Sequence, residues 1–368
     1  MSDDVANGPA PRTGRRPFFG ETDAPHHSEE LARMLPLHGV GAMPADLAAI
    51  ARRRRIHVVG GTDVAPVVEI TRARADGDSA DERHWHIDID LCDGQTQDGP
   101  DIRAMRADAS VYRAAIDPNV GFRGHRPAWM DLSFFPKAAS PRNRPSMRRI
   151  SGGSTRPNAF DRRLYHDASY PWGCIGRVST HDANGSGVLV GRNLVVTAGH
   201  VVPWDTRGAV RFDTNHFGTH GVSAQAIEAR GFDTALTGYD WAILRLDRPL
   251  GDIVGFMGYN DYLNRWEDRA YWNIVGFPEG LGPFYQSGIS IHDDDEDDND
   301  GQELESQNAD TIDGDSGAPL FGFWKDDPRV VGVVSGVASE HNPGYEENHV
   351  MAGGPGLSAL IAWGRTNW

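Results

Sequence analysis

The sequence GDSGAPL at residues 314–320 places a serine between two glycines in a tight turn that leads into an apolar strand. A serine hydroxyl is a weak nucleophile at neutral pH, because it needs an imidazole to take its proton and a buried acceptor to fix that imidazole's tautomer. A glycine at 314 allows the backbone N–H groups of Gly314 and Ser316 to point at one oxygen. The turn therefore predicts Ser316 as a nucleophile, with Gly314 and Ser316 as its oxyanion hole.

Two other motifs supply the imidazole and the acceptor. TAGH at residues 197–200 ends an apolar run, so His200 stands where a predicted strand gives way to a loop. YDWAIL at residues 239–244 puts Asp240 directly before a strong strand, where its carboxylate would be buried. The order His200, Asp240, Ser316 excludes the subtilisin order of Asp, His, Ser and the α/β-hydrolase order of Ser, Asp, His. We predict a catalytic triad with His200 as base, Asp240 as its orienter and Ser316 as nucleophile.

Each motif has a structural alternative when it is taken alone. A single histidine after a strand is more often structural than catalytic, an aspartate before an apolar strand is common, and GDSG can occur in any turn. The three together, in this order and in a β-rich region, favour catalysis. A scaffold that only binds other proteins stays an alternative, although such scaffolds usually lack a triad member.

The two parts of the chain differ in sequence pattern. After about residue 168, short β-type runs alternate with turn residues, as in a sandwich or barrel, and GLSALIAWG near the end has helical spacing. Residues 1–149 favour a mixed α+β region with a Pro- and Arg-rich linker. The elements expected there are helices at Glu29–Leu37 and Ala45–Arg55 and strands at Ile56–Gly60, Val67–Thr71 and His84–Leu91. We therefore expect an N-terminal pro- or regulatory region, 1–149, before a catalytic domain, 150–368.

From about Tyr170 to its end, the chain resembles the trypsin-like (chymotrypsin-fold) serine peptidases, most closely their bacterial V8-like (glutamyl endopeptidase-like) branch. The motifs that carry the resemblance are YPW at 170–172, CIGRV at 174–178, GSGVLV at 185–190, TAGH at 197–200, GFP at 276–278 and DT at 310–311. The resemblance implies an all-β catalytic domain, a double six-stranded β-barrel with a C-terminal helix and the active site between the barrels. It also implies substrate binding by Asp310, Thr311, Ser335, Gly336 and Val337, the last three as the edge that pairs with the substrate backbone.

The motifs leave the specificity for the residue before the cleaved bond, P1, open. Val334 stands where the glutamate-specific members have a histidine, which argues against that kind of pocket. Asp310 lies six residues before Ser316, where trypsins place the aspartate that binds Lys or Arg. Basic, acidic and other P1 residues all stay possible.

A second hypothesis concerns activation. In the branch of the family that is activated by cleavage, the acid at the position of Asp315 receives a newly formed N-terminal ammonium. The junction Arg149–Ile150, followed by Ser-Gly-Gly, is a candidate for such a cut, which would let Ile150 pair with Asp315. The alternative is that the arginines belong to a solvated linker and that Asp315 bonds locally.

Charge and composition limit the partners. Residues 1–149 carry 21 basic and 21 acidic residues, whereas residues 150–368 carry 15 and 31, for a net charge of −16. An acidic catalytic half repels phosphates, so the expected partner is a polypeptide substrate and not a nucleic acid. The run Asp293–Gly301 is expected to be a disordered, solvated loop rather than a calcium site, and no cofactor or metal is expected.

Localisation stays open between a secreted and a cytoplasmic protein. No apolar run approaches the roughly 18–20 residues that cross a bilayer, and residues 1–30 lack the apolar core of a signal peptide. Cys92 and Cys174 do not make a disulfide framework. We expect a serine endopeptidase whose N-terminal region docks on the catalytic domain. The alternative function is an intracellular regulatory protease that cuts one protein partner.

Overall fold

The apolar runs in the middle of the chain form a closed barrel. Its strands are β5 (Ile175–Ser179), β6 (Asn184–Gly191), β7 (Leu194–Thr197), β8 (Val210–Thr214), β9 (Ser223–Gly231) and β10 (Ala242–Leu246). They are hydrogen-bonded in the order β10-β7-β6-β5-β8-β9, and the barrel closes because β10 also pairs with β9. A further strand, β3 (Arg103–Arg106), extends β9 in the parallel direction. Closure removes the unpaired edges that an open sheet of these strands would expose.

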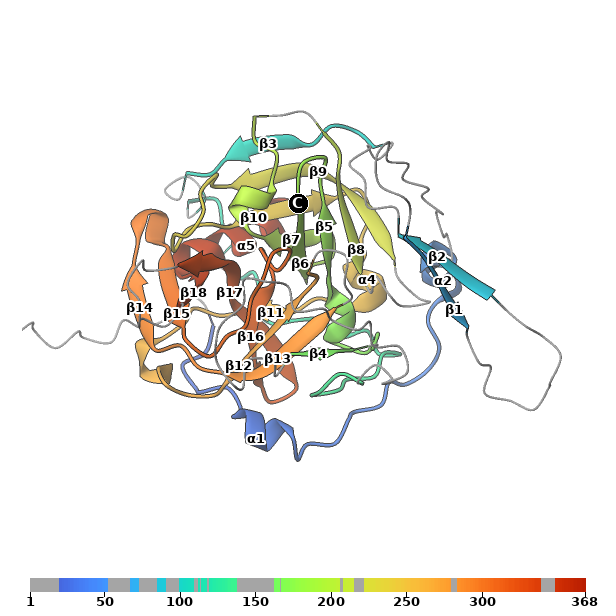
Figure 1. Cartoon of the computed structure of the whole chain (residues 1–368), viewed down its shortest axis with the longest axis horizontal. Helices are drawn as coiled ribbons and strands as arrows, with labels where there is room; N and C mark the ends of the chain where they lie inside the picture. The colour runs from blue at the N-terminus through green and yellow to red at the C-terminus, as the bar shows by residue number, and fades with distance from the viewer. Residues whose placement is uncertain are drawn as a thin grey trace, which may run out of the picture.

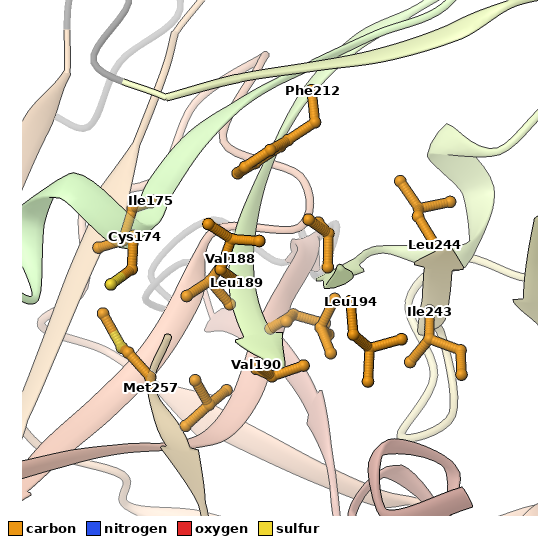
Figure 2. Packing of buried hydrophobic residues seen from close by; sticks show 14 of the residues in the cluster. Cys174, Ile175, Val188, Leu189, Val190, Leu194, Phe212, Ile243, Leu244 and Met257 are labelled. Atoms are coloured by element: carbon orange, nitrogen blue, oxygen red, sulfur yellow. The ribbon is translucent and has the colours of Figure 1, made fainter. Parts of the chain in front are cut away.

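Branched aliphatic side chains fill the interior of this barrel. Val188 and Val190 on β6, Val196 on β7 and Ile243 on β10 are fully buried. Figure 2 shows their neighbours at close range, with side chains from several strands directed into one core. Strands that are buried on both faces read as continuous apolar runs, which explains why the sequence pattern predicted them so readily.

The second half of the catalytic region is a wider sheet. Its strands are β4 (Arg163–Leu164), β11 (Gly258–Tyr259), β12 (Trp272–Gly276), β13 (Phe284–Ile289), β14 (Asp293–Glu296), β15 (Gln302–Ser306), β16 (Pro319–Trp324), β17 (Asp327–Ala338) and β18 (Asn348–Gly353). They follow the order β14-β15-β18-β17-β16-β12-β13-β4, with β11 beside β17. Figure 1 places this sheet next to the barrel.

The prediction of an all-β domain with a six-stranded barrel is confirmed, and the second half is broader than the six strands expected. The β14–β15 hairpin adds to one side of this sheet and β4 to the other. Over the part of the chain that the structure describes, no pairing joins the outermost strands β14 and β4. The acidic run lies within β14 and the adjoining turn η5 (Asp298–Asp300), so the expectation of a disordered loop was wrong.

Helices are few and short apart from the last one. The described helices are α1 (Ser28–Leu31), α2 (Ala45–Ala51), α4 (Gly251–Val254) and α5 (Pro355–Asn367), with short 3₁₀ turns η2 (Trp172–Cys174), η3 (Gly199–Val201) and η4 (Asn264–Trp266). The predicted C-terminal helix is confirmed as α5. Its Arg365 donates hydrogen bonds to the carbonyls of Val190 and Met257, which ties the helix to the barrel.

Residues 23–26 of the N-terminal region lie along the second sheet, whereas β3 lies beside the barrel. The Trp324 indole N–H donates to the Asp23 carbonyl (2.6 Å), and the His26 N–H donates to the Phe323 carbonyl (2.8 Å). The expected strands near residues 67 and 84 form as β1 (Val67–Arg72) and β2 (Trp85–Asp90), an antiparallel pair. The first helix is shorter than expected, and the second is described as far as Ala51. The rest of the second expected helix and the expected strand at residues 56–60 lie outside the described residues.

The structure is a computed structural model that describes residues 20–51, 67–72, 85–90, 99–108, 112, 114–117, 119–137, 162–165, 167–205, 208–214, 222–278, 283–338 and 348–368. The predicted boundary between residues 149 and 150 lies outside these ranges and stays a prediction. Within the described ranges, no helix has the length and apolar character needed to span a bilayer.

Substitution of Trp172 measures how much its packing against the second sheet stabilises the fold. It is fully buried, lies against the rings of Tyr285 and Phe321 of the second sheet, and donates its indole N–H to the Ser133 carbonyl (2.9 Å). Trp172→Ala leaves a cavity and should lower the free energy of unfolding by about 3–5 kcal/mol in denaturant titrations. Leu35→Ala, at an exposed side chain, should change it by less than about 0.5 kcal/mol. Equal changes in the free energy of unfolding for the two variants would contradict this packing role of Trp172.

Candidate active site

The pairing of β7 with β10 brings His200 and Asp240 together. Ala242 at the start of β10 is the register partner of Thr197 at the end of β7, and the strands are antiparallel. The residues that follow β7 and those that precede β10 therefore emerge at the same end of the barrel. His200 follows there in η3, and Asp240 lies two residues before β10.

The Asp240 carboxylate is fully buried and accepts three hydrogen bonds. Its Oδ1 accepts the backbone N–H of His200 (3.0 Å), and its Oδ2 lies 2.7 Å from Nδ1 of the His200 ring. The Ser335 hydroxyl donates to the same Oδ2 (2.6 Å) and accepts the N–H of Leu236 (2.8 Å). A carboxylate in this position keeps the imidazole proton on Nδ1, so Nε2 is the nitrogen that can take a proton.

Gly199 makes the close approach of these segments possible. A Cβ at this position would collide with the carbonyl oxygen of Phe232 and crowd Oδ1 of Asp240. The Gly199 carbonyl accepts a hydrogen bond from the Trp204 indole (2.8 Å). The glycine of the TAGH motif is thus required by packing around Asp240, which the sequence motif alone does not reveal.

Ser186 joins the serine turn to the barrel. Its backbone N–H donates to the Ser316 carbonyl (2.7 Å), and its hydroxyl donates to the Gly314 carbonyl (2.9 Å). The same hydroxyl accepts the N–H of Phe277 (2.9 Å), from the second sheet. These bonds hold the serine turn between the barrel and the second sheet. Sequence reasoning missed Ser186, although it lies in the GSGVLV motif.

The turn itself has the backbone geometry that its glycines predict. Gly314 has φ 93° and Gly317 has φ 83°, in the region that disfavours side chains. A Cβ at 317 would also collide with the Ser186 carbonyl and the Thr197 hydroxyl. Among the described residues, the N–H groups of Gly314 and Ser316 donate no hydrogen bond.

Ser316 is partly exposed, and its hydroxyl makes no hydrogen bond to any described residue. His200 is the predicted base. Its side chain is 30% exposed, so it can contact a bound substrate. Hydrogen bonds between a nucleophile and its base are often long before substrate binds and tighten in the complex. The structure therefore brings His200 and Asp240 into direct contact and holds the Ser316 turn against the same end of the barrel.

Asp315 forms a second buried ion pair behind the turn. Its Oδ1 accepts Nη2 of Arg162 (2.9 Å), its Oδ2 lies 2.7 Å from Nη1 of Arg162, and Oδ2 also accepts the Ile312 N–H (2.9 Å). Burial raises the pKa of the Asp315 carboxyl, and the Arg162 guanidinium opposes that rise. Removing one partner of a buried pair typically costs roughly 3–5 kcal/mol. Arg162 was not predicted as a partner of Asp315, and the predicted partner, Ile150, lies outside the described residues.

His349 joins the predicted substrate-binding residues. The Thr311 hydroxyl lies 2.7 Å from Nδ1 of His349, which also accepts the Thr311 N–H (3.3 Å). His349 lies on β18 opposite Val337 of β17, beside the predicted edge Ser335–Val337. Sequence reasoning missed His349, because no motif surrounds it and only the register of β17 and β18 places it there.

Asp310 and the acidic hairpin lie beside the same cluster. The Asp310 N–H donates to Oε1 of Gln286 (2.8 Å). In the hairpin, Asp297 accepts the N–H of Gly238 (2.8 Å), so the acidic run supports the loop that carries Asp240. Within the described residues, no group of three His, Cys, Asp or Glu side chains could hold a metal ion.

Comparisons with known proteins fit this geometry. Residues 185–333 match the family model described as the trypsin-like peptidase domain. Over 108 residues, the chain is 27% identical to the glutamyl endopeptidase of Bacillus licheniformis, an alignment that covers 27% of this chain and 34% of that protein. The chain thus spans about a third of the length of the curated relative that it matches.

Two solved structures are also similar. A Glu endopeptidase in complex with MPD has a TM-score of 0.46 at 17% identity, over 56% of this chain and 97% of that chain. An inactive form of the Rv3671c protease has a TM-score of 0.37 at 17% identity, over 52% of this chain and 88% of that chain. The family match and the curated relative confirm the resemblance to trypsin-like serine peptidases and to their V8-like branch.

The hydrogen bonds of Ser186 can be tested by a stability measurement that does not depend on catalysis. Ser186→Ala removes the hydroxyl that binds the Gly314 carbonyl and leaves the buried Phe277 N–H without its acceptor. The free energy of unfolding should fall by about 1–3 kcal/mol in denaturant titrations. Ser290→Ala removes a hydroxyl at an exposed hydrogen bond and should change stability by less than about 0.5 kcal/mol. A Ser186→Ala protein as stable as the Ser290→Ala control would contradict the assigned bonds.

Proposed function

We propose that this chain, whose residues 185–333 match the trypsin-like peptidase domain, is a serine endopeptidase that acts through Ser316, His200 and Asp240. The observation that carries the proposal is the buried Asp240 carboxylate, which accepts both the backbone N–H and the ring Nδ1 of His200. A carboxylate so placed orients the ring and leaves Nε2 as the nitrogen that can exchange a proton, as a general base must. A purely binding scaffold would not require that arrangement.

In the proposed mechanism, Nε2 of His200 takes the proton of Ser316 as Oγ attacks the scissile carbonyl. The proton then passes to the leaving amine, and the acyl group stays on Ser316 until water, activated by the same imidazole, releases it. The N–H groups of Gly314 and Ser316 stabilise the oxyanion in both steps. Asp240 holds the imidazole in the required tautomer and stabilises its charged form.

A fluorophosphonate probe, which phosphonylates activated serines with loss of fluoride, tests this proposal. The wild-type chain should incorporate one probe at Ser316, read out by intact mass and peptide mapping. Ser316→Ala should not be labelled, and His200→Ala should be labelled more slowly by a factor on the order of 10³ or more, because the base is absent. Ser290→Ala, which removes an exposed hydroxyl bound to Asn308, should label like wild type. Absence of labelling in the wild-type chain would leave the non-catalytic alternative.

We also propose an acidic P1 preference, supported by the contact between Thr311 and His349. Nδ1 of His349 accepts the Thr311 N–H, so the proton of the neutral ring lies on Nε2, a hydrogen-bond donor. With Nδ1 unprotonated, the Thr311 hydroxyl donates to it and orients the ring. An imidazole N–H beside the predicted edge Ser335–Val337 suits a carboxylate side chain. His349 would take the place of the histidine that Val334 replaces. The relative from Bacillus licheniformis carries the name glutamyl endopeptidase, which agrees with this preference.

Peptide substrates that differ only at P1 test the preference. The wild-type kcat/KM should be higher for P1 Glu than for P1 Arg or Leu. His349→Gln should lower kcat/KM for P1 Glu by about 10-fold or more, because a hydrogen bond to a charged group contributes roughly 1.5–3 kcal/mol, while the P1 Leu value changes little. A wild-type preference for P1 Arg would instead favour Asp310 as the determinant.

The remaining parts of the proposed function concern the rest of the chain. We propose that residues 1–149 are a pro- or regulatory region that docks on the catalytic domain, supported by the contacts of Asp23 and His26 with the second sheet. Cleavage near Arg149–Ile150 would separate this region from the catalytic domain. The alternative, a regulatory protease that cuts one protein partner, requires no such cleavage.

A further inference from the structure

Asp315 lies between the two residues whose N–H groups form the proposed oxyanion hole. Its own backbone is fixed on both sides, since its N–H donates to the Ile312 carbonyl (2.9 Å) and its carbonyl accepts the Ala318 N–H (2.7 Å). Its side chain is fully buried. Whatever holds this carboxylate therefore also sets the orientation of the peptide groups of Gly314 and Ser316.

Arg162 holds the carboxylate with a two-point contact. Nη2 and Nη1 of the guanidinium reach Oδ1 and Oδ2 of Asp315 at 2.9 and 2.7 Å. The Arg162 side chain is only 6% exposed, and it lies over the Phe284 ring at 5.5 Å. A planar guanidinium matches a carboxylate in this bidentate way and fixes its orientation as well as its charge.

The strand pairing next to Arg162 explains how it reaches this position. Leu164 of β4 pairs with Phe284 of β13, and the Tyr165 N–H donates to the Pro283 carbonyl (3.1 Å). Tyr165 is buried against the Trp172 ring. The segment that carries Arg162 is thus part of the second sheet, and it lies on the C-terminal side of the Arg149–Ile150 bond.

The space around the Asp315 carboxylate leaves little room for another cation. Oδ2 also accepts the Ile312 N–H (2.9 Å), and a Cβ at Gly276 would collide with Oδ1. An ammonium from a new N-terminus would have to displace Arg162 from both oxygens. We propose, on the basis of the proposed serine endopeptidase function, that Arg162 is the positioning residue for the oxyanion turn and that the uncut chain is already competent for acylation.

The first experiment asks whether cleavage is needed. The double variant Arg148→Gln/Arg149→Gln removes the candidate cleavage site, and intact mass verifies that the labelled chain is uncut. It should react with a fluorophosphonate at Ser316 within 2-fold of the wild-type rate. Labelling that appears only after the wild-type chain is cut at Arg149 would overturn the inference. This result does not depend on the folding of any Arg162 variant.

The second experiment asks whether Arg162 acts through Asp315. Arg162→Gln should slow the reaction of Ser316 with the fluorophosphonate in the uncut chain by about 100-fold. This is the effect expected from losing one oriented oxyanion donor. Arg163→Gln, the exposed neighbour on β4, is the matched control and should react like wild type. Arg162→Gln/Asp315→Asn removes both charges and should recover at least 10-fold of the lost rate, because no unpaired carboxylate then remains.

The outcomes separate positioning from packing. If Arg162 only packed on Phe284, the Arg162→Gln/Asp315→Asn variant would be as slow as Arg162→Gln, and this result overturns the inference. An Arg162→Gln variant as fast as wild type overturns it as well. If no form of the wild-type chain, cut or uncut, is labelled at Ser316, the proposed function fails, and the inference fails with it.

Discussion

The buried carboxylate of Asp240 is the constraint on which the rest of the site depends. It stands at the start of a barrel strand and binds His200 from the barrel through two hydrogen bonds. It also accepts the hydroxyl of Ser335, which belongs to β17 of the second sheet. A buried charge without partners would be strongly unfavourable, so these donors must all be in place when the protein is folded. One carboxylate thus orients the proposed base and joins the two sheets at the site.

The turn that carries Ser316 is likewise held by buried polar contacts from several parts of the chain. Ser186 of the barrel binds two carbonyls of the turn and one N–H of the second sheet, and Arg162 binds the carboxylate of Asp315 behind it. The backbone of Ser316 is therefore fixed from the barrel, from the second sheet and from the segment that precedes the barrel. Rigid support of this kind allows two N–H groups to stay unpaired in the folded protein and to be ready for a substrate oxygen.

Much of the fold could be predicted because its physical causes are local. The barrel strands are continuous apolar runs such as Asn193–Ala198, and the final helix has apolar residues at helical spacing, so both carry a periodic signal. The second sheet was predicted less well. Its edge strand β14 consists of aspartates and glutamate, which have low strand propensity, and it forms because β15 supplies its backbone partners. The acidic composition alone therefore misled the prediction of a disordered loop.

The sequence by itself determined which side chains could perform the chemistry, because the residues beside them are under local constraint. Glycine is needed at 314 and 317 for backbone angles that other residues avoid, and His200 and Asp240 each adjoin the end of an apolar strand. Only the tertiary structure decided the partners of these groups. Arg162 is 153 residues from Asp315, Ser186 is 128 residues from Gly314, and His349 is 38 residues from Thr311. Hydrogen bonds between strands depend on register and leave no periodic trace in the chain, so no local pattern could have identified them.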